Sequence, residues 1–157
     1  MQLFQKCALL GLVAAVPAAA HALLLPTTNP CFTSGTATYR ISAAAPAPDY
    51  RVRIDNAAAQ PDLRVGLVDQ PEIADFVLVD DLDDVQGNAC AASTPPKTIR
   101  VDAGEMLPDL TVSLSQIGAA DASDFKLYVR SARFSQEDAA ALFGVMWRSR
   151  SRSLAQR

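Results

Sequence analysis

The chain has 157 residues, of which 50% are apolar and 6% aromatic, and its formal net charge is −3 at pH 7. This length suits one domain with a single core, packed mainly by Ala, Val and Leu. The acidic balance argues against a nucleic-acid-binding domain, which is usually basic.

The first 22 residues have the three parts of a secretory signal peptide. Lys6 gives the positive charge, and residues 7–16 form an apolar run about half as long as a membrane span. Small residues after Pro17 offer cleavage after Ala20 or Ala22. We therefore expect a periplasmic or secreted protein without a membrane span. If the signal peptide is retained instead, it anchors the chain in the membrane.

Of the three cysteines, Cys7 lies within this signal peptide, which leaves Cys31 and Cys90. Two cysteines in an exported chain usually form a disulfide, and we expect this pair to do so. The alternative, a metal site or a catalytic thiol, lacks further Cys or His ligands. The one histidine, His21, could bind copper only if it became the first mature residue, and no cofactor is expected.

The composition divides the exported chain into three parts. Residues 23–48 are rich in proline and predict an extended N-terminal segment. Residues 49–147 carry the regular hydrophobic patterns of a single α+β domain. Residues 148–157 contain four arginines and predict a basic, disordered tail; the alternative is that this basic stretch lies on an anionic membrane.

Alternating apolar and polar residues predict about five to six strands. The segments are 50–54, 63–67, 98–102, 110–115 and 125–130, with a short edge strand at 36–41. The continuous apolar run at 76–79 predicts a central strand that is covered on both faces. Pro71 begins a predicted helical turn before that run.

One helix is predicted after Ser135, a good N-cap residue with Asp138 three positions later. Ala139, Leu142 and Met146 recur at helical spacing and give it one apolar face. Because the strands have one polar face, we expect a two-layer α+β fold, with an antiparallel or mixed sheet covered by this helix.

An acidic cluster follows the run at 76–79. It consists of Asp80, Asp81, Asp83 and Asp84. Such carboxylates can bind Ca²⁺, although their spacing differs from that of an EF-hand loop. A solvated strand end is the alternative, and the sequence favours it.

A cationic face is a second candidate site, because alternate side chains of a strand lie on one side of the sheet. Its members are Arg51, Arg53, Arg64, Arg100, Lys126 and Arg130. Guanidinium groups bind phosphate or carboxylate with fork geometry, so the face predicts an anionic envelope component or an acidic protein as partner. The alternative is a solvated face neutralised by neighbours such as Asp55 and Asp102.

No catalytic signature is present. Without a histidine after cleavage, a Ser–His–Asp or Cys–His nucleophile is excluded, and no zinc or phosphate-loop motif occurs. A small carboxylate-dependent hydrolase of the envelope stays open as the alternative, with Glu72, Asp102, Glu105 and Asp109 as its carboxylates. The sequence favours a non-catalytic role.

Three segments, 61–81, 97–115 and 125–147, resemble a group of small secreted proteins of alphaproteobacteria that have no assigned activity. The resemblance implies an exported, envelope-associated protein and transfers no catalytic residue. Together with the residues above, it predicts a binding or structural role in the cell envelope.

Overall fold

A computed structural model describes residues 30–79, 90, 95–116 and 123–155. The predicted signal peptide, His21 and the acidic cluster at 80–84 lie outside the described residues. The elements follow the chain in a simple order. They are β1 (Cys31–Ser34), β2 (Ala37–Ile41), β3 (Tyr50–Ile54), β4 (Leu63–Leu67), the 3₁₀ helix η1 (Pro71–Ile73), β5 (Phe76–Val79), β6 (Lys97–Val101), β7 (Leu110–Ser115), β8 (Phe125–Arg130) and α1 (Gln136–Ala155).

All eight strands belong to one sheet with the order β1-β2-β6-β3-β7-β4-β8-β5. Only β1 and β2 pair antiparallel; every other neighbouring pair is parallel. The first run of strands, β2 to β5, therefore interleaves with the second run, β6 to β8. Within each run, the connection between two consecutive strands passes over the one strand of the other run that lies between them.

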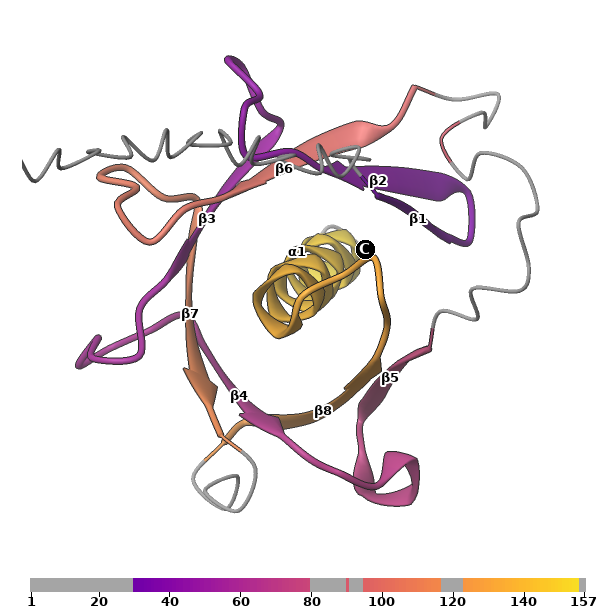
Figure 1. Cartoon of the computed structure of the whole chain (residues 1–157). Helices are drawn as coiled ribbons and strands as arrows, with labels where there is room; N and C mark the ends of the chain where they lie inside the picture. Colours follow the sequence, from indigo (N-terminus) through magenta and orange to yellow (C-terminus); the bar gives the residue numbers. More distant parts are fainter. Residues whose placement is uncertain (1–29, 80–89, 91–94, 117–122, 156–157) are drawn as a thin grey trace, which may run out of the picture.

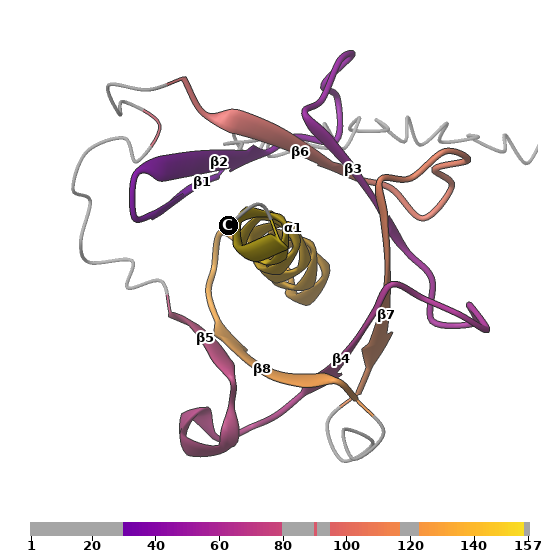
Figure 2. The ribbon, with the colours of Figure 1, turned by 180° about the vertical axis from the view of Figure 1, so that it is seen from behind.

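The sheet curls around α1, as Figures 1 and 2 show from opposite sides. Inward side chains of the strands, such as Val52 and Leu127, are 0% exposed. On the helix, Ala139, Ala140, Ala141 and Leu142 are also 0% exposed, so strands surround this part of it. The core of the domain is the contact between the helix and the concave face of the sheet.

Gly144 allows the helix to approach β7 closely. A Cβ atom at this position would lie 2.6 Å from Cδ2 of Leu110, which is itself buried. Glycine weakens a helix, but any side chain here would overpack the core. Its position in the helix is therefore explained by packing.

The N-terminus of α1 is capped as the sequence predicts. The Ser135 Oγ accepts a hydrogen bond from the Asp138 N–H at 3.0 Å, and the Asp138 Oδ2 accepts one from the Ser135 N–H at 3.0 Å. This reciprocal pair satisfies two backbone donors that the first turn of a helix leaves free.

An aspartate lies directly before each of five parallel strands, and its side chain hydrogen-bonds to the neighbouring strand. In each case Oδ2 accepts a backbone N–H of the adjacent strand, at 2.6–2.9 Å. The pairs are Asp49–Thr98, Asp62–Thr111, Asp75–Lys126, Asp109–Arg51 and Asp124–Arg64. Every one of these contacts joins a strand of one run to a strand of the other run, and so together they favour the interleaved register.

The α+β class is confirmed, but the predicted strand count is wrong, because the sheet has eight strands instead of five to six. The helix does not cover one face of a flat layer; the sheet wraps around it (Figure 1). The run at 76–79 is also misplaced, since β5 is an edge strand whose Val77 and Val79 are 43% and 44% exposed.

The boundaries expected at both ends differ from the structure. Residues 31–41, within the segment predicted to be extended and outside the domain, form β1 and β2 of the sheet. At the other end, α1 continues to Ala155, through much of the stretch predicted to be a disordered tail. Arg148 of that stretch donates a hydrogen bond from Nη1 to the carbonyl oxygen of Asp109, which attaches the helix to the start of β7.

A disulfide joins Cys31 to Cys90 with a Cα–Cα distance of 5.3 Å. Cys31 begins β1, one end of the sheet, and Cys90 follows β5, the other end. The covalent bond therefore attaches the first strand of the sheet to the connection between β5 and β6.

Candidate functional site

The six predicted cations lie on strands whose opposite faces pack on the helix, so their side chains are on the convex, outer face. Register places Arg51 directly beside Arg100 on β6, and Arg53 beside Thr111 on β7. Arg64 is paired with Ser113, Lys126 with Gly66, and Arg130 with Val79. The cations therefore extend from β6 to β8, and Arg40 on β2 lies beyond them, paired with Thr98.

Connections between parallel strands run back over this face. Residues 42–49 join β2 to β3 across β6, and residues 102–109 join β6 to β7 across β3. In Figure 1 these connections project outside the ring of strands. The outward arginines of β6 and β3 therefore lie among the connections and not on a bare sheet.

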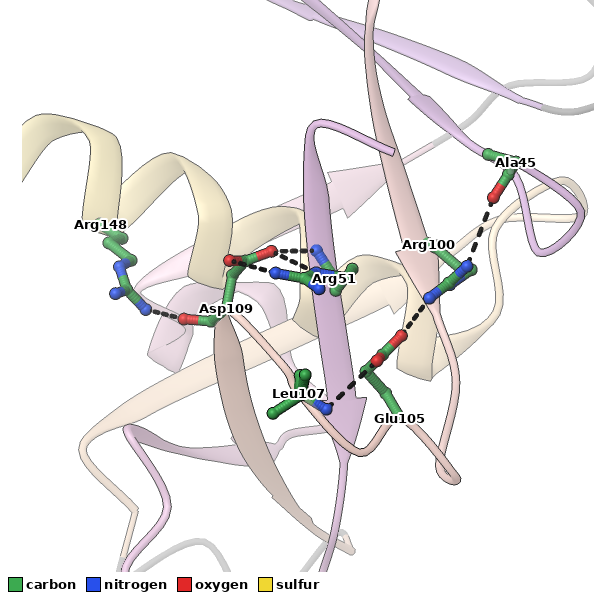
Figure 3. Close-up of polar contacts among 7 residues, drawn as sticks. All are labelled: Ala45, Arg51, Arg100, Glu105, Leu107, Asp109 and Arg148. Atoms are coloured by element: carbon green, nitrogen blue, oxygen red, sulfur yellow. Dashed lines mark hydrogen bonds and ion pairs between the residues drawn. The ribbon is translucent and has the colours of Figure 1, made fainter. Parts of the chain in front are cut away.

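Arg100 links two of these connections, as Figure 3 shows. Its Nη1 donates to the carbonyl oxygen of Ala45 at 3.4 Å, and its Nη2 donates to Oε2 of Glu105. The side chains of Arg100 and Glu105 are 26% and 9% exposed. The hydrogen bond from Arg100 is the main cause that lowers the pKa of Glu105. Arg100 thus holds the connections against the sheet.

Arg51 forms a fork with Asp109 (Figure 3). The Arg51 Nε donates to Oδ2 at 3.1 Å and Nη2 donates to Oδ1 at 3.3 Å. These bonds, with the attraction of the two charges, raise the pKa of Arg51 and lower that of Asp109. Both side chains are 38–40% exposed, so solvent screens the pair and its net contribution to stability is small.

Arg53 is held more loosely. Its Nε lies 3.9 Å from Oδ2 of Asp55, and its Nη2 donates to the Thr111 Oγ1 at 3.5 Å. The Nε atoms of Arg53 and Arg100 are buried without a hydrogen-bond partner. Three of the predicted cations, Arg51, Arg53 and Arg100, are thus neutralised by carboxylates of the chain itself.

Three outward cations differ, because they form no ion pair with any described residue: Arg40, Arg64 and Lys126. Arg64 is exposed, and its one side-chain bond is from Nη2 to the carbonyl oxygen of Ala59 at 3.3 Å. Arg64 and Lys126 are diagonal neighbours on β4 and β8, because Gly66 pairs with Lys126. We call Arg40, Arg64 and Lys126 the open cations.

Apolar side chains are exposed on the same side. Met106 and Leu107, in the connection across β3, are 87% and 72% exposed. The N–H of Leu107 donates to Oε1 of Glu105 at 3.3 Å, so the tip is anchored beside Arg100 (Figure 3). Cations and an apolar tip therefore share the outer face.

Among the described ranges, no group of three or more His, Cys, Asp or Glu residues is arranged to hold a metal ion. The four aspartates predicted as weak calcium ligands follow β5 and lie outside the described residues. No helix in the described part of the chain is long and apolar enough to cross a membrane.

Three of the four carboxylates of the hydrolase alternative have other partners. Asp109 and Glu105 bind arginines, and the pKa of each is lowered. The Oδ1 of Asp102 accepts the N–H of Gly104 at 2.8 Å, which closes a tight turn. A general acid needs a raised pKa, so Glu105 and Asp109 do not resemble the acid of a glycosidase.

We expect Glu105→Gln to make stability less sensitive to acid. Because Arg100 lowers the folded pKa of Glu105, the ion pair contributes fully above the unfolded value of 4.5. The contribution is lost as the pH falls through the lowered folded value. The difference in Tm between pH 7 and pH 3 should therefore be smaller in the variant than in the parent chain; an equal or larger difference would contradict the role of this pair.

Comparison with known proteins gives no relative: the chain matches no protein-family model, no curated protein and no solved structure.

Proposed function

We propose that this protein is an exported, non-catalytic binding module that docks on an anionic surface of the cell envelope. Export is supported by the signal-peptide pattern at the start of the sequence and by a disulfide, which persists in oxidising compartments. The binding surface is the outer face of the sheet.

The observation that carries the proposal is the division of the outer cations. Arg51, Arg53 and Arg100 have carboxylate partners, whereas the open cations have none among the described residues. Free guanidinium and ammonium groups bind phosphate oxygens, Arg by a fork and Lys as a point charge. The open cations are therefore the residues available to an external anion.

The exposed Met106 and Leu107 favour lipid head groups over other anions. Apolar side chains can enter the boundary between head groups and acyl chains while nearby cations contact phosphates. Each cation near an anionic membrane contributes about 1 kcal/mol. Because the sheet curls into a ring, β2, which carries Arg40, lies across the ring from β4 and β8, which carry Arg64 and Lys126 (Figure 1). A flat membrane therefore contacts only part of this set at a time, which supports weak, reversible and salt-dependent binding.

The test compares two variants with the same change in net charge, using vesicles that contain phosphatidylglycerol. Arg64→Gln/Lys126→Gln removes two open cations, and Arg133→Gln/Arg150→Gln removes two cations that lie outside the strands of the sheet. At about 1 kcal/mol per cation, we expect the first variant to bind roughly 30-fold more weakly. The second should lose much less, and equal losses would contradict the assigned surface.

Poly-L-glutamate serves as the second probe. Binding to this polymer but not to the vesicles would overturn the lipid surface in favour of an acidic polypeptide. The hydrolase alternative has less support, because Glu105 and Asp109 are bound to arginines of the chain and their lowered pKa values are unsuited to a general acid.

A further inference from the structure

A groove lies at the seam of the sheet, between β1 and β5, beside the C-terminal half of α1. Two pockets, with volumes of about 220 Å³ and 350 Å³, share Ser34, Met146 and Arg150 as lining residues. They therefore adjoin, and Arg150 lies where they meet. Together they have the size of a site for a small ligand or a few residues of a peptide.

The smaller pocket is aromatic. Phe32 from β1, Phe76 from β5, and Phe143 and Trp147 from α1 line it. Their rings pack against one another, with centroids 6.4 Å apart for Phe32–Phe76 and 5.2 Å apart for Phe76–Phe143. Trp147 remains 36% exposed. Such a pocket accepts an apolar side chain.

Arg150 adds an unused positive charge. Its side chain is exposed and forms no hydrogen bond or ion pair with the described residues, although it lines both pockets. Asp75 also lines the smaller pocket, but its Oδ2 accepts the N–H of Lys126 at 2.7 Å and is committed to the sheet. A ligand that pairs an apolar group with a carboxylate therefore complements this groove.

The edge of β5 provides backbone groups for an added strand. Within the described residues, β5 pairs only with β8, so its other edge is unpaired. Its sequence, Phe-Val-Leu-Val, contains none of the charges or prolines that usually protect an edge strand. The outward Val77 and Val79 are half-exposed, and a strand added beside β5 would partly cover them.

We propose that the groove binds the C-terminal segment of a partner polypeptide as an extended strand, antiparallel to β5. The direction follows from the position of the pocket, which adjoins Asp75 and Phe76 at the start of β5. An antiparallel strand brings its own C-terminus to that end. Its last side chain then enters the aromatic pocket, and its terminal carboxylate pairs with Arg150, while backbone bonds to β5 hold the preceding residues.

The probe is the hexapeptide acetyl-Val-Thr-Val-Thr-Val-Phe, with a free C-terminal carboxylate or with a C-terminal amide. Trp147 is the one tryptophan of the chain, so its fluorescence reports occupancy of the pocket. We expect the free acid to bind at least about tenfold more tightly than the amide, since only the acid presents a charged carboxylate to Arg150.

Two further comparisons separate the contributions. Arg150→Gln should weaken the acid to the level of the amide and leave the amide unchanged, whereas Arg148→Gln on the same helix should preserve the preference for the acid. A peptide N-methylated at alternate residues should bind more weakly, because it cannot pair with β5.

Equal affinity for acid and amide would overturn the carboxylate site. If N-acetylphenylalanine bound as tightly as the hexapeptide, the added strand would be refuted. Neither result depends on the lipid surface.

Discussion

Replacing both disulfide cysteines, Cys31→Ser/Cys90→Ser, is expected to lower the free energy of unfolding by about 4 kcal/mol. The bond closes a loop with a sequence separation of 59, and it attaches β1 to the connection between β5 and β6. Chain entropy in the unfolded state gives the larger part of this effect. Guanidinium unfolding, followed by far-ultraviolet circular dichroism, measures the loss.

The control uses a reducing agent. Reductant should shift the unfolding midpoint of the parent chain towards that of the double variant, and it should leave the double variant unchanged. If the parent chain and the double variant unfolded at the same midpoint without reductant, the disulfide would add nothing to the stability that non-covalent contacts provide, and the prediction would be wrong.

The second large effect is expected from Leu142→Ala, which should cost about 3–4 kcal/mol of stability. Leu142 is 0% exposed on the helix that the sheet encircles, and strands lie around this part of it. The surroundings therefore cannot collapse easily into the space that the side chain leaves. Gln136→Ala, at the exposed start of the same helix, is the matched control and should change stability little.

Thermal or denaturant unfolding of the two helix variants gives the comparison. Should Leu142→Ala prove no more harmful than Gln136→Ala, the helix would not be the centre of the core, and the curled arrangement around it would be wrong.

Local patterns predicted most of the elements. Alternation identified β3, β4, β7 and β8 with nearly their observed bounds, and the Ser135–Asp138 pair identified the start of the helix. These predictions succeed because alternation and capping depend on neighbours along the chain. The disulfide also followed from counting cysteines.

The order of the strands could not be predicted in this way. Alternation shows that a strand has one buried face, but it gives neither its neighbours nor their direction. The polar faces suggested an antiparallel or mixed sheet, and the sheet is mixed, but every neighbouring pair except β1–β2 is parallel. The outer face is polar although the pairs are parallel, because the connections cross it and only partly cover it. Likewise, the apolar run of β5 indicated a central strand, whereas β5 is an edge strand and its outward side chains are half-exposed.

One signal in the sequence does mark the interleaved sheet. Asp49, Asp62 and Asp75 recur at intervals of 13 residues, each directly before a strand, and Asp109 and Asp124 hold the same position in the second run. A carboxylate repeated at this point reaches the N–H of a neighbouring strand. The repeat indicates equivalent strand units, although it does not by itself show how they alternate.

The cationic face was placed correctly by alternation, but its available charge was not. The carboxylates of Glu105 and Asp109 come from a connection that crosses the sheet, and sequence spacing gives no sign that they reach Arg100 and Arg51. The open cations can be identified only once those ion pairs are known. Arg40, which belongs to them, was not included in the predicted face, although an edge strand was predicted at 36–41 and β2 is observed there.

The most direct measurement is co-sedimentation of the full exported chain with vesicles of phosphatidylcholine, with and without phosphatidylglycerol, at low and high salt. The proposed outer-face contact predicts binding only to the anionic vesicles, weakened strongly as salt screens the open cations. Equal binding to neutral and anionic vesicles, or binding that salt does not affect, would contradict it.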